Sequence, residues 1–268
     1  MNPFGPGHRT EQFHYNNYSQ RSFEVTGDKI NPLLDVVFDG VHIMDGDIVS
    51  PKPQVIITLK DENRFLALDT SSFKVFITDP AGNQLPVYYI TGQGMLVLDF
   101  TPPNLPNNNA KIQWSPQFTL DGTYELLVQA KDKSGNNSGK FDYRIRFEVI
   151  NKSTITNVMN YPNPFTTSTR FVFTLTGSEM PEYFKIQIMT ISGKVVKEIT
   201  QDEIGPMNIG RNITAYAWDG RDEFGDPLAN GVYLYRVVSK LNGESIEKRE
   251  TSADTYFKNG WGKMYLMR

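Results

Sequence analysis

The sequence predicts an all-β chain made of two tandem β-sandwiches. Three observations support this fold class: short runs of period-two hydrophobicity, many turn residues between them, and the absence of any helix-length apolar period with caps at both ends. The 268 residues include 21 glycines and 16 prolines, which suits short strands joined by tight turns. A chain of this length also exceeds the common size of one domain, so two modules are expected.

The composition of the chain argues against several classes of function. The net charge of −3 and the lack of a long basic cluster argue against a nucleic-acid partner. The sequence has no cysteine, which excludes disulfides, thiolate metal sites and a cysteine nucleophile within these residues. No apolar run approaches the ~20 residues that span a bilayer, so direct membrane insertion is not expected. No motif for a cofactor is present, and we expect none to be bound.

Residues 1–30 alternate polar and aromatic positions without a strand or helix pattern. They are too short to form a domain, and we expect them to continue from an upstream domain. They also lack the apolar core of a secretory signal, so a signal peptide is expected further upstream.

Residues 31–152 are expected to form the first sandwich. The predicted strands are 33–38, 54–60, 73–77, 86–90, 95–100 and 110–114, followed by a hairpin of 122–130 and 142–149. In the last strand Tyr143, Ile145, Phe147 and Val149 share one face, opposite a charged face. The hairpin, with its turn at 131–137, resembles the last hairpin of many bacterial immunoglobulin-like repeats.

Residues 153–268 are expected to form the second sandwich, after the polar connector at 151–154. Alternating runs lie at 171–175, 184–188 and 195–199, and the turn Ile191-Ser192-Gly193-Lys194 should join the last two as a hairpin. An inward face at Tyr233, Tyr235 and Val237 follows, and Lys263 to Arg268 should close the chain as a final strand.

Three motifs mark this second module. In Tyr161-Pro162-Asn163-Pro164-Phe165 the prolines favour extended neighbours, so Tyr161 and Phe165 are expected to pack inward. Trp218 should anchor the core beside the turns Asp219-Gly220 and Phe224-Gly225-Asp226. Asn230-Gly231 should set the beginning of the strand that continues through Val232-Tyr233-Leu234-Tyr235-Arg236.

In this order, the motifs resemble two related families: the immunoglobulin-like domain of flagellar hook-capping proteins and the carboxyl-terminal sorting domain of the type IX secretion system. The resemblance covers residues 155–268. It implies an immunoglobulin-like fold, and the terminal strand Gly262 to Arg268 favours the sorting domain. The chain departs from that family by extra residues between Leu241 and Gly260. Such longer endings behind an immunoglobulin-like module resemble the tail of large surface proteins related to the sortase of that system, a peptidase family with a Cys/His pair.

The resemblance implies a noncatalytic carboxyl-terminal region of a larger exported bacterial protein. Residues 153–268 would be recognised by protein partners of the export machinery at the outer membrane, and residues 31–152 would be a spacer or interaction module. The protein would be secreted or held at the cell surface, and its oligomeric state stays open. We expect docking through exposed strand edges. The expected docking residues are Gly231, Val232, Tyr233, Lys263, Met264, Tyr265, Leu266, Met267 and Arg268.

Acidic residues are weak candidates for a calcium site, because hard cations need clustered oxygens. Asp219, Asp222, Glu223 and Asp226 lie close in sequence but lack calcium-loop spacing, and hydrogen bonding within turns is the simpler explanation. The groups Asp45-Gly46-Asp47 and Asp61-Glu62-Asn63 have less support, and surface loops explain them. We therefore expect no metal.

No nucleophile, base and orienting group occur together in a motif, so an enzyme is not expected. Of the three histidines, His8 and His14 lie in the amino-terminal segment, and His42 is expected to face solvent in a strand at 41–44. Lys185 and Lys197 are expected to be outward solubility charges.

Two rival functions remain. One is a scaffold or cap module of a surface or filament assembly. The other is an accessory carbohydrate-binding module, which would need Trp114, Tyr88 and Tyr89 exposed as a flat platform. Their alternation in strands favours core packing instead.

Overall fold

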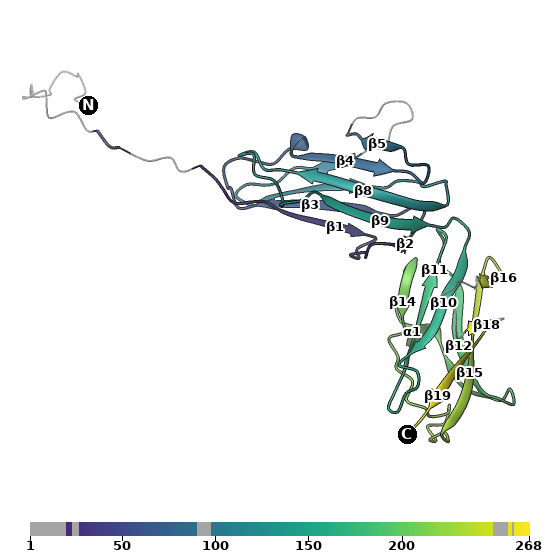
Figure 1. The fold of residues 1–268 in the computed structure, drawn as a ribbon. Coiled ribbons are helices and arrows are strands. Elements are labelled where there is room, and N and C mark those ends of the chain that lie inside the picture. Colours follow the sequence, from purple (N-terminus) through teal and green to yellow (C-terminus); the bar gives the residue numbers. More distant parts are fainter. Residues whose placement is uncertain (1–19, 23–26, 90–97, 249–256, 259) are drawn as a thin grey trace, which may run out of the picture.

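The computed structural model describes residues 20–22, 27–89, 98–248, 257–258 and 260–268. Almost all regular structure in these residues is β-strand. The helices are a 3-10 turn at Thr70–Ser72 and the single turn α1 at Gln201–Ile204. In the described part of the chain, no helix has the length and apolar content needed to cross a membrane. The predicted all-β fold with two tandem sandwiches is confirmed (Figure 1).

The first sandwich stacks two sheets around one core. One sheet has the order β1-β3-β7-β6 and the other the order β2-β9-β8-β4-β5. The β2–β9 pair is parallel and the other pairs are antiparallel. The strands are β1 Leu33–Phe38, β2 Asp47–Val49, β3 Val55–Asp61, β4 Phe73–Thr78, β5 Gln84–Val87, β6 Leu98–Thr101, β7 Asn108–Trp114, β8 Gly122–Ala130 and β9 Tyr143–Val149.

Period-two alternation explains how this core forms. Alternate side chains of β3, β7, β8 and β9 point between the sheets, where they form one apolar cluster. Phe118 belongs to this cluster and contacts the rings of Trp114, Tyr124 and Phe147. The predicted hairpin of β8 and β9 is present, with Tyr124 opposite Phe147.

The second sandwich has the sheets β14-β11-β10-β17 and β13-β12-β15-β19-β18, with β16 added beside β15. Its core lies between residues of β10 and β11 on one side and β12, β15 and β19 on the other. Trp218 is fully buried in it, as expected. The strands are β10 Thr154–Tyr161, β11 Arg170–Leu175, β12 Tyr183–Thr190, β13 Val195–Ile199, β14 Gly210–Ile213, β15 Gly231–Leu241, β16 Glu244–Ser245, β17 Glu247–Lys248, β18 Phe257–Lys258 and β19 Trp261–Leu266.

The predicted hairpin of β12 and β13 is present. Its turn is closed by backbone hydrogen bonds from Thr190 to Lys194 at 2.9 Å and from Gly193 to Thr190 at 3.0 Å. Gly193 has φ +87°, which glycine adopts without steric cost.

Two local predictions are wrong. Tyr161 does not pack inward but is 71 % exposed, because Asn160 takes the inward position at the end of β10 and successive side chains alternate. Residues 41–44 are not a strand, although His42 is exposed as expected and lies 2.7 Å from Asp35. Parts of two predicted strands, at 90 and 95–97, lie outside the described residues.

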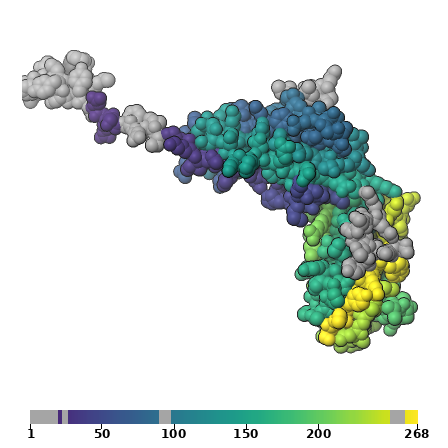
Figure 2. Space-filling model, viewed as in Figure 1, coloured from purple at the N-terminus to yellow at the C-terminus, as the bar shows by residue number. Residues whose placement is uncertain are grey.

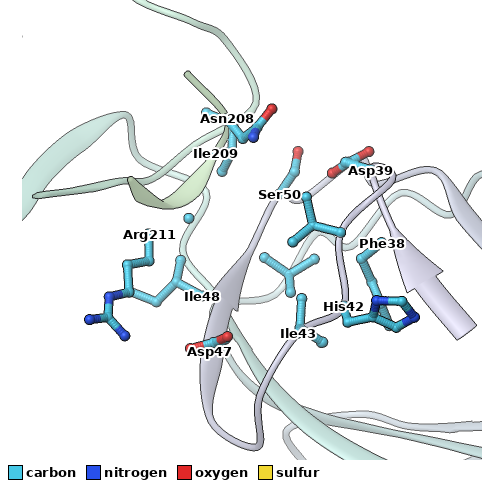
Figure 3. Close-up of a pocket in the computed structure, with 13 residues that line it drawn as sticks. Phe38, Asp39, His42, Ile43, Asp47, Ile48, Ser50, Asn208, Ile209 and Arg211 are labelled. Atoms are coloured by element: carbon cyan, nitrogen blue, oxygen red, sulfur yellow. The ribbon is translucent and has the colours of Figure 1, made fainter. Parts of the chain in front are cut away.

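The connector between the sandwiches is bonded to both. The backbone N–H of Asn151 donates to Asp121 of the first sandwich at 2.8 Å, and Thr176 of the second donates to the carbonyl of Lys152 at 2.6 Å. Figure 3 shows residues of both modules facing each other, with Ile48 on one side and Ile209 on the other. The cavity between them is about 90 Å³, and a Cβ at Gly210 would lie 2.7 Å from the carbonyl oxygen of Ile48. The backbones of the two modules therefore pack closely at this joint.

Candidate functional site

The expected docking residues lie on two strands that pair with each other. β15 and β19 run antiparallel, with Gly231 opposite Leu266 and Tyr233 opposite Met264. The side chains of Tyr233, Met264 and Leu266 point into the core and are almost fully buried. Those of Lys263 and Met267 are exposed, as is Gly231. Val232 and Tyr265 are half-buried on the outer face. The expected set thus divides into core residues and surface residues.

Gly262 lets β19 lie against a buried aromatic ring. It is opposite Tyr235 on β15, and a Cβ built at position 262 would come within 1.9 Å of that ring. Tyr235 is fully buried and its ring contacts Phe171 at 5.0 Å between centroids. A glycine at the beginning of the last strand is therefore a packing requirement.

The proline-flanked motif supports the outer edge of β19. The side chain of Asn163 donates to the carbonyl of Lys263 at 3.1 Å and accepts from the backbone N–H of Tyr265 at 3.0 Å. Phe165 continues the pairing: its N–H donates to the carbonyl of Tyr265 at 3.0 Å, and its carbonyl accepts from Met267 at 2.9 Å. Asn163 and Phe165 thus act as a short surrogate strand.

The last residue is held by the other two motifs. The side chain of Asn230 accepts from the backbone N–H of Arg268 at 2.8 Å and donates to its carbonyl at 3.0 Å. The Arg268 guanidinium donates to the carbonyl of Asp219. A Cβ at Gly220 would lie 2.9 Å from both Arg268 and Leu266, so this turn also approaches the last strand closely. We call Asn163, Phe165, Gly220, Asn230 and Arg268 the terminal clamp.

The terminal clamp limits how β19 could dock through its edge. The backbone groups of β19 between Lys263 and Met267 that face away from β15 are bonded to Asn163 and Phe165, and β18 pairs with its beginning. β15 lies between β12 and β19. Among the described residues, β19 therefore offers no free edge between Lys263 and Met267, so addition of a partner strand to it would require opening the clamp.

The outer face of β15 and β19 is partly exposed to solvent. Figure 2 shows the atoms of the last strand, in yellow, along the surface of the second sandwich. Two basic groups lie over aromatic rings on this face: Arg236 at 5.2 Å from the Trp261 centroid and Lys263 at 5.1 Å from that of Tyr265. Such pairs hold cationic and aromatic groups at the surface in a defined arrangement.

The weak metal candidates are engaged in turns. Asp222 Oδ1 accepts the backbone N–H groups of Phe224 at 3.0 Å and Asp226 at 2.9 Å, and Asp219 accepts from Arg221 at 3.1 Å. Glu223 accepts from the backbone of Glu198. These bonds fit the turn interpretation of the acidic residues.

The two lysines expected to be solubility charges are ion-paired. The Glu198 carboxylate, 2.9 Å away, raises the pKa of Lys185. Burial opposes protonation of Lys197, but ion pairs with Glu203 at 3.2 Å and Glu223 at 3.4 Å leave its pKa raised. The Lys197 side chain is only 13 % exposed, so its assignment as an outward charge is wrong.

The aromatic platform of the carbohydrate alternative does not form. Trp114 is 1 % exposed and packs edge-on against Phe118, while Tyr89 packs against the core beside Phe100. Of the three expected residues only Tyr88 is exposed.

Sequence reasoning missed Asn163 and Asn230 as clamp residues. Asn163 directly precedes Pro164, which restricts the backbone, and Asn230 directly precedes Gly231, which allows it unusual conformations; an amide side chain beside such a residue was the available signal. It also placed Asp61 in a surface loop, whereas this residue ends β3 and is 4 % exposed.

No protein-family model matches the chain, and no curated protein does. Among solved structures, the chain is similar to dimeric latent PorU from Porphyromonas gingivalis, with 17% identity, a TM-score of 0.33, and coverage of 90% of this chain and 20% of that one. It is also similar to the BSP domain of a biofilm associated protein (12% identity, TM-score 0.25, 81% of this chain and 27% of that one). The chicken CNTN1 FN1-FN3 domains give 11% identity, a TM-score of 0.24, and coverage of 84% of this chain and 68% of that one. The chain thus spans about a fifth of the PorU chain.

Proposed function

We propose that this chain is the noncatalytic carboxyl-terminal region of a larger exported bacterial protein, and that its second sandwich is a sorting signal for the type IX secretion machinery. The first sandwich would then be a spacer or interaction module. The observation that carries the proposal is the terminal clamp. The motifs that resemble the sorting domain, around Asn163, Gly220 and Asn230, all contact the last strand or the last residue.

Under this proposal the secretion machinery binds a folded module rather than a disordered tail. Because Met264 and Leu266 belong to the core, the last strand reaches its partner already ordered. Recognition then falls on the outward groups of the expected docking set. These are Gly231, Val232, Lys263, Tyr265, Met267 and Arg268.

The outer face also has chemistry that a protein partner would recognise. Lys263 and Arg236 place positive charge beside Tyr265 and Trp261. An acidic partner surface complements such a face. Opposite potentials speed the encounter of the two proteins, and like charges repel a wrong partner. Aromatic and arginine side chains are also frequent at binding hot spots.

An export assay tests the proposal. A fluorescent protein with a signal peptide is fused in front of residues 1–268 and expressed in a gliding bacterium that has the type IX system. We expect fluorescence in the medium or at the cell surface. Retention of this fusion in the periplasm would contradict the sorting role.

Surface variants separate recognition from folding. Lys263→Glu reverses an exposed charge on β19 and should lower export several-fold without changing the melting temperature. Lys194→Glu makes the same change in the exposed β12–β13 turn and should leave export unchanged. Equal export of both variants would place recognition elsewhere on the module.

A further inference from the structure

A second group of polar residues lies in the first sandwich, away from the terminal clamp. One carboxylate oxygen from each of Asp28, Asp61 and Glu62 lies within 4.8 Å of the others. Asp61 is the last residue of β3, and Asp28 comes from the segment that precedes β1. The chain thus brings three carboxylates together from two separate segments. No other such group of three is present among the described residues.

Asp61 is the unusual member of this group. It is 4 % exposed, and its Oδ1 atom is buried without a hydrogen-bond partner. Its other oxygen accepts a bond of 3.2 Å from the Asn108 amide. Burial raises the pKa of Asp61, and the nearby carboxylates of Glu62, Asp132 and Asp28 raise it further, although the backbone of Asn63 acts in the opposite direction.

None of the three carboxylates is held in an ion pair within the described residues. Burying an uncompensated carboxylate is costly, and proteins normally pair it or use it to coordinate a metal. The unpartnered Asp61 oxygen is therefore evidence for a missing positive ligand, independent of the clustering itself.

The surrounding residues hold the group in place. Asp28 accepts bonds from Asn63 at 3.1 Å and from Ser134 at 3.3 Å, and its backbone carbonyl accepts from Asn136 at 3.2 Å. Hydrogen bonds, first from the backbone of Ile30 and then from Asn63, lower the pKa of Asp28, which keeps it ionised. Asp28 is thus oriented by neutral donors.

The group also has space beside it. A surface cavity of about 430 Å³ is lined by Asp61 and Glu62 together with Asn107, Asn108 and Asn109, and also by Lys60, Arg64 and Pro106. This cavity gives an ion access to Asp61 and Glu62 and room for the water ligands that complete its coordination.

We propose that Asp28, Asp61 and Glu62 form a calcium-binding site at the amino-terminal end of the first sandwich. Calcium takes six to eight oxygen ligands at about 2.3–2.6 Å, so ligands on opposite sides of the ion lie about 4.8 Å apart. Magnesium requires a smaller octahedron at about 2.0–2.1 Å and keeps most of its water. An irregular set of three carboxylates with cavity water therefore fits calcium better.

The bound ion would tie the incoming chain to the module. Figure 1 shows the described segment just before β1 at the end of the first sandwich that lies away from the second. Asp28 is on that segment, whereas Asp61 and Glu62 belong to the sandwich. Calcium would therefore stiffen the connection between this module and the residues that precede it.

Calcium titration of the full chain tests the site. After removal of metal with EDTA, isothermal titration calorimetry should show one Ca²⁺ bound with a dissociation constant of about 10⁻⁴–10⁻³ M, the range of extracellular modules, and weaker binding of Mg²⁺. Asp61→Asn should weaken Ca²⁺ binding at least tenfold. Asp99→Asn makes the same charge change at an exposed position of the same sandwich and should bind like the wild type.

Two further measurements distinguish loss of the calcium site in Asp61→Asn from misfolding of the variant. Without metal, Asp61→Asn should melt at a higher temperature than the wild type, because it removes a buried charge that forms no ion pair. Calcium should slow cleavage by endoproteinase Lys-C after the exposed Lys29 in the wild type but not in Asp61→Asn. Absence of Ca²⁺ uptake by the wild type up to about 10 mM, tenfold above the weakest expected constant, would overturn the proposal, as would unchanged affinity in Asp61→Asn.

Discussion

Replacing Gly262 with alanine should destabilise the second sandwich by about 3 kcal/mol, the upper end of the usual cost of overpacking. The added Cβ would come within 1.9, 2.2 and 2.5 Å of three atoms of the Tyr235 ring. That ring is fully buried against Phe171, so it has no open space into which it can turn. Either β19 must shift away from β15 or the ring must displace its neighbours, and both responses cost packing.

Differential scanning calorimetry of the full chain measures this effect. A loss of about 3 kcal/mol lowers the melting temperature of a domain of this size by roughly 10 °C or more. Lys263→Ala, an exposed change on the same strand, is the control and should cost little. Combining Gly262→Ala with Tyr235→Leu should restore part of the loss, since the smaller side chain makes room. A Gly262→Ala variant as stable as the wild type would refute the register of β19 against β15.

Three further changes test other parts of the molecule. Asn163→Ala removes two hydrogen bonds to β19 and should lower the free energy of unfolding by about 1–2 kcal/mol in urea denaturation, whereas an unchanged value would argue against the clamp. Gly210→Ala places a Cβ 2.7 Å from the Ile48 carbonyl and should loosen the joint, seen as a larger maximum dimension in small-angle X-ray scattering, and an identical profile would count against that contact. The pKa of Glu198 is lowered first by Gln187 and then by Lys185, so its contribution to stability is present above its ordinary pKa of 4.5 and is lost as the pH falls through the lower folded value. Glu198→Gln should flatten this acid dependence of the melting temperature, and equal pH profiles would contradict the assignment.

The strands that were predicted best carry local signals. β8 begins and ends at Gly122 and Ala130 as expected, because alternation of apolar residues and the flanking turns are both visible in one short window. Trp218 was correctly placed in the core for a similar reason, since a large aromatic beside turn residues has few other positions that bury it.

The inward position of Asp61 could have been predicted from the alternation of residues in β3. Val55, Ile57 and Leu59 occupy the inward positions of β3, and continuing the same alternation by one more step makes Asp61 inward as well. A charged residue on the core side of a strand is unusual, so the pattern itself indicated a special role.

The contacts of Asn163 could not be predicted in this way. Its partners on β19 are about 100 residues away in sequence, and Asn163 follows a bulged strand, β10, whose Asn157 has φ +52°. The same irregularity lies upstream of Tyr161, whose exposure contradicted the expectation. Long-range register is set by the whole sheet rather than by the residues of one segment.

The terminal clamp also changes what a deletion experiment on this module can show. Removing residues 263–268 would remove Met264 and Leu266 from the core and free the groups that Asn163, Phe165 and Asn230 now bond. Each buried apolar truncation costs about 2–5 kcal/mol, and whole domains are stable by only about 5–15 kcal/mol. Such a deletion would therefore unfold the module, and loss of export would not distinguish a missing signal from a missing fold. Only substitutions at outward positions such as Lys263 and Tyr265, made in a module shown to melt normally, isolate recognition.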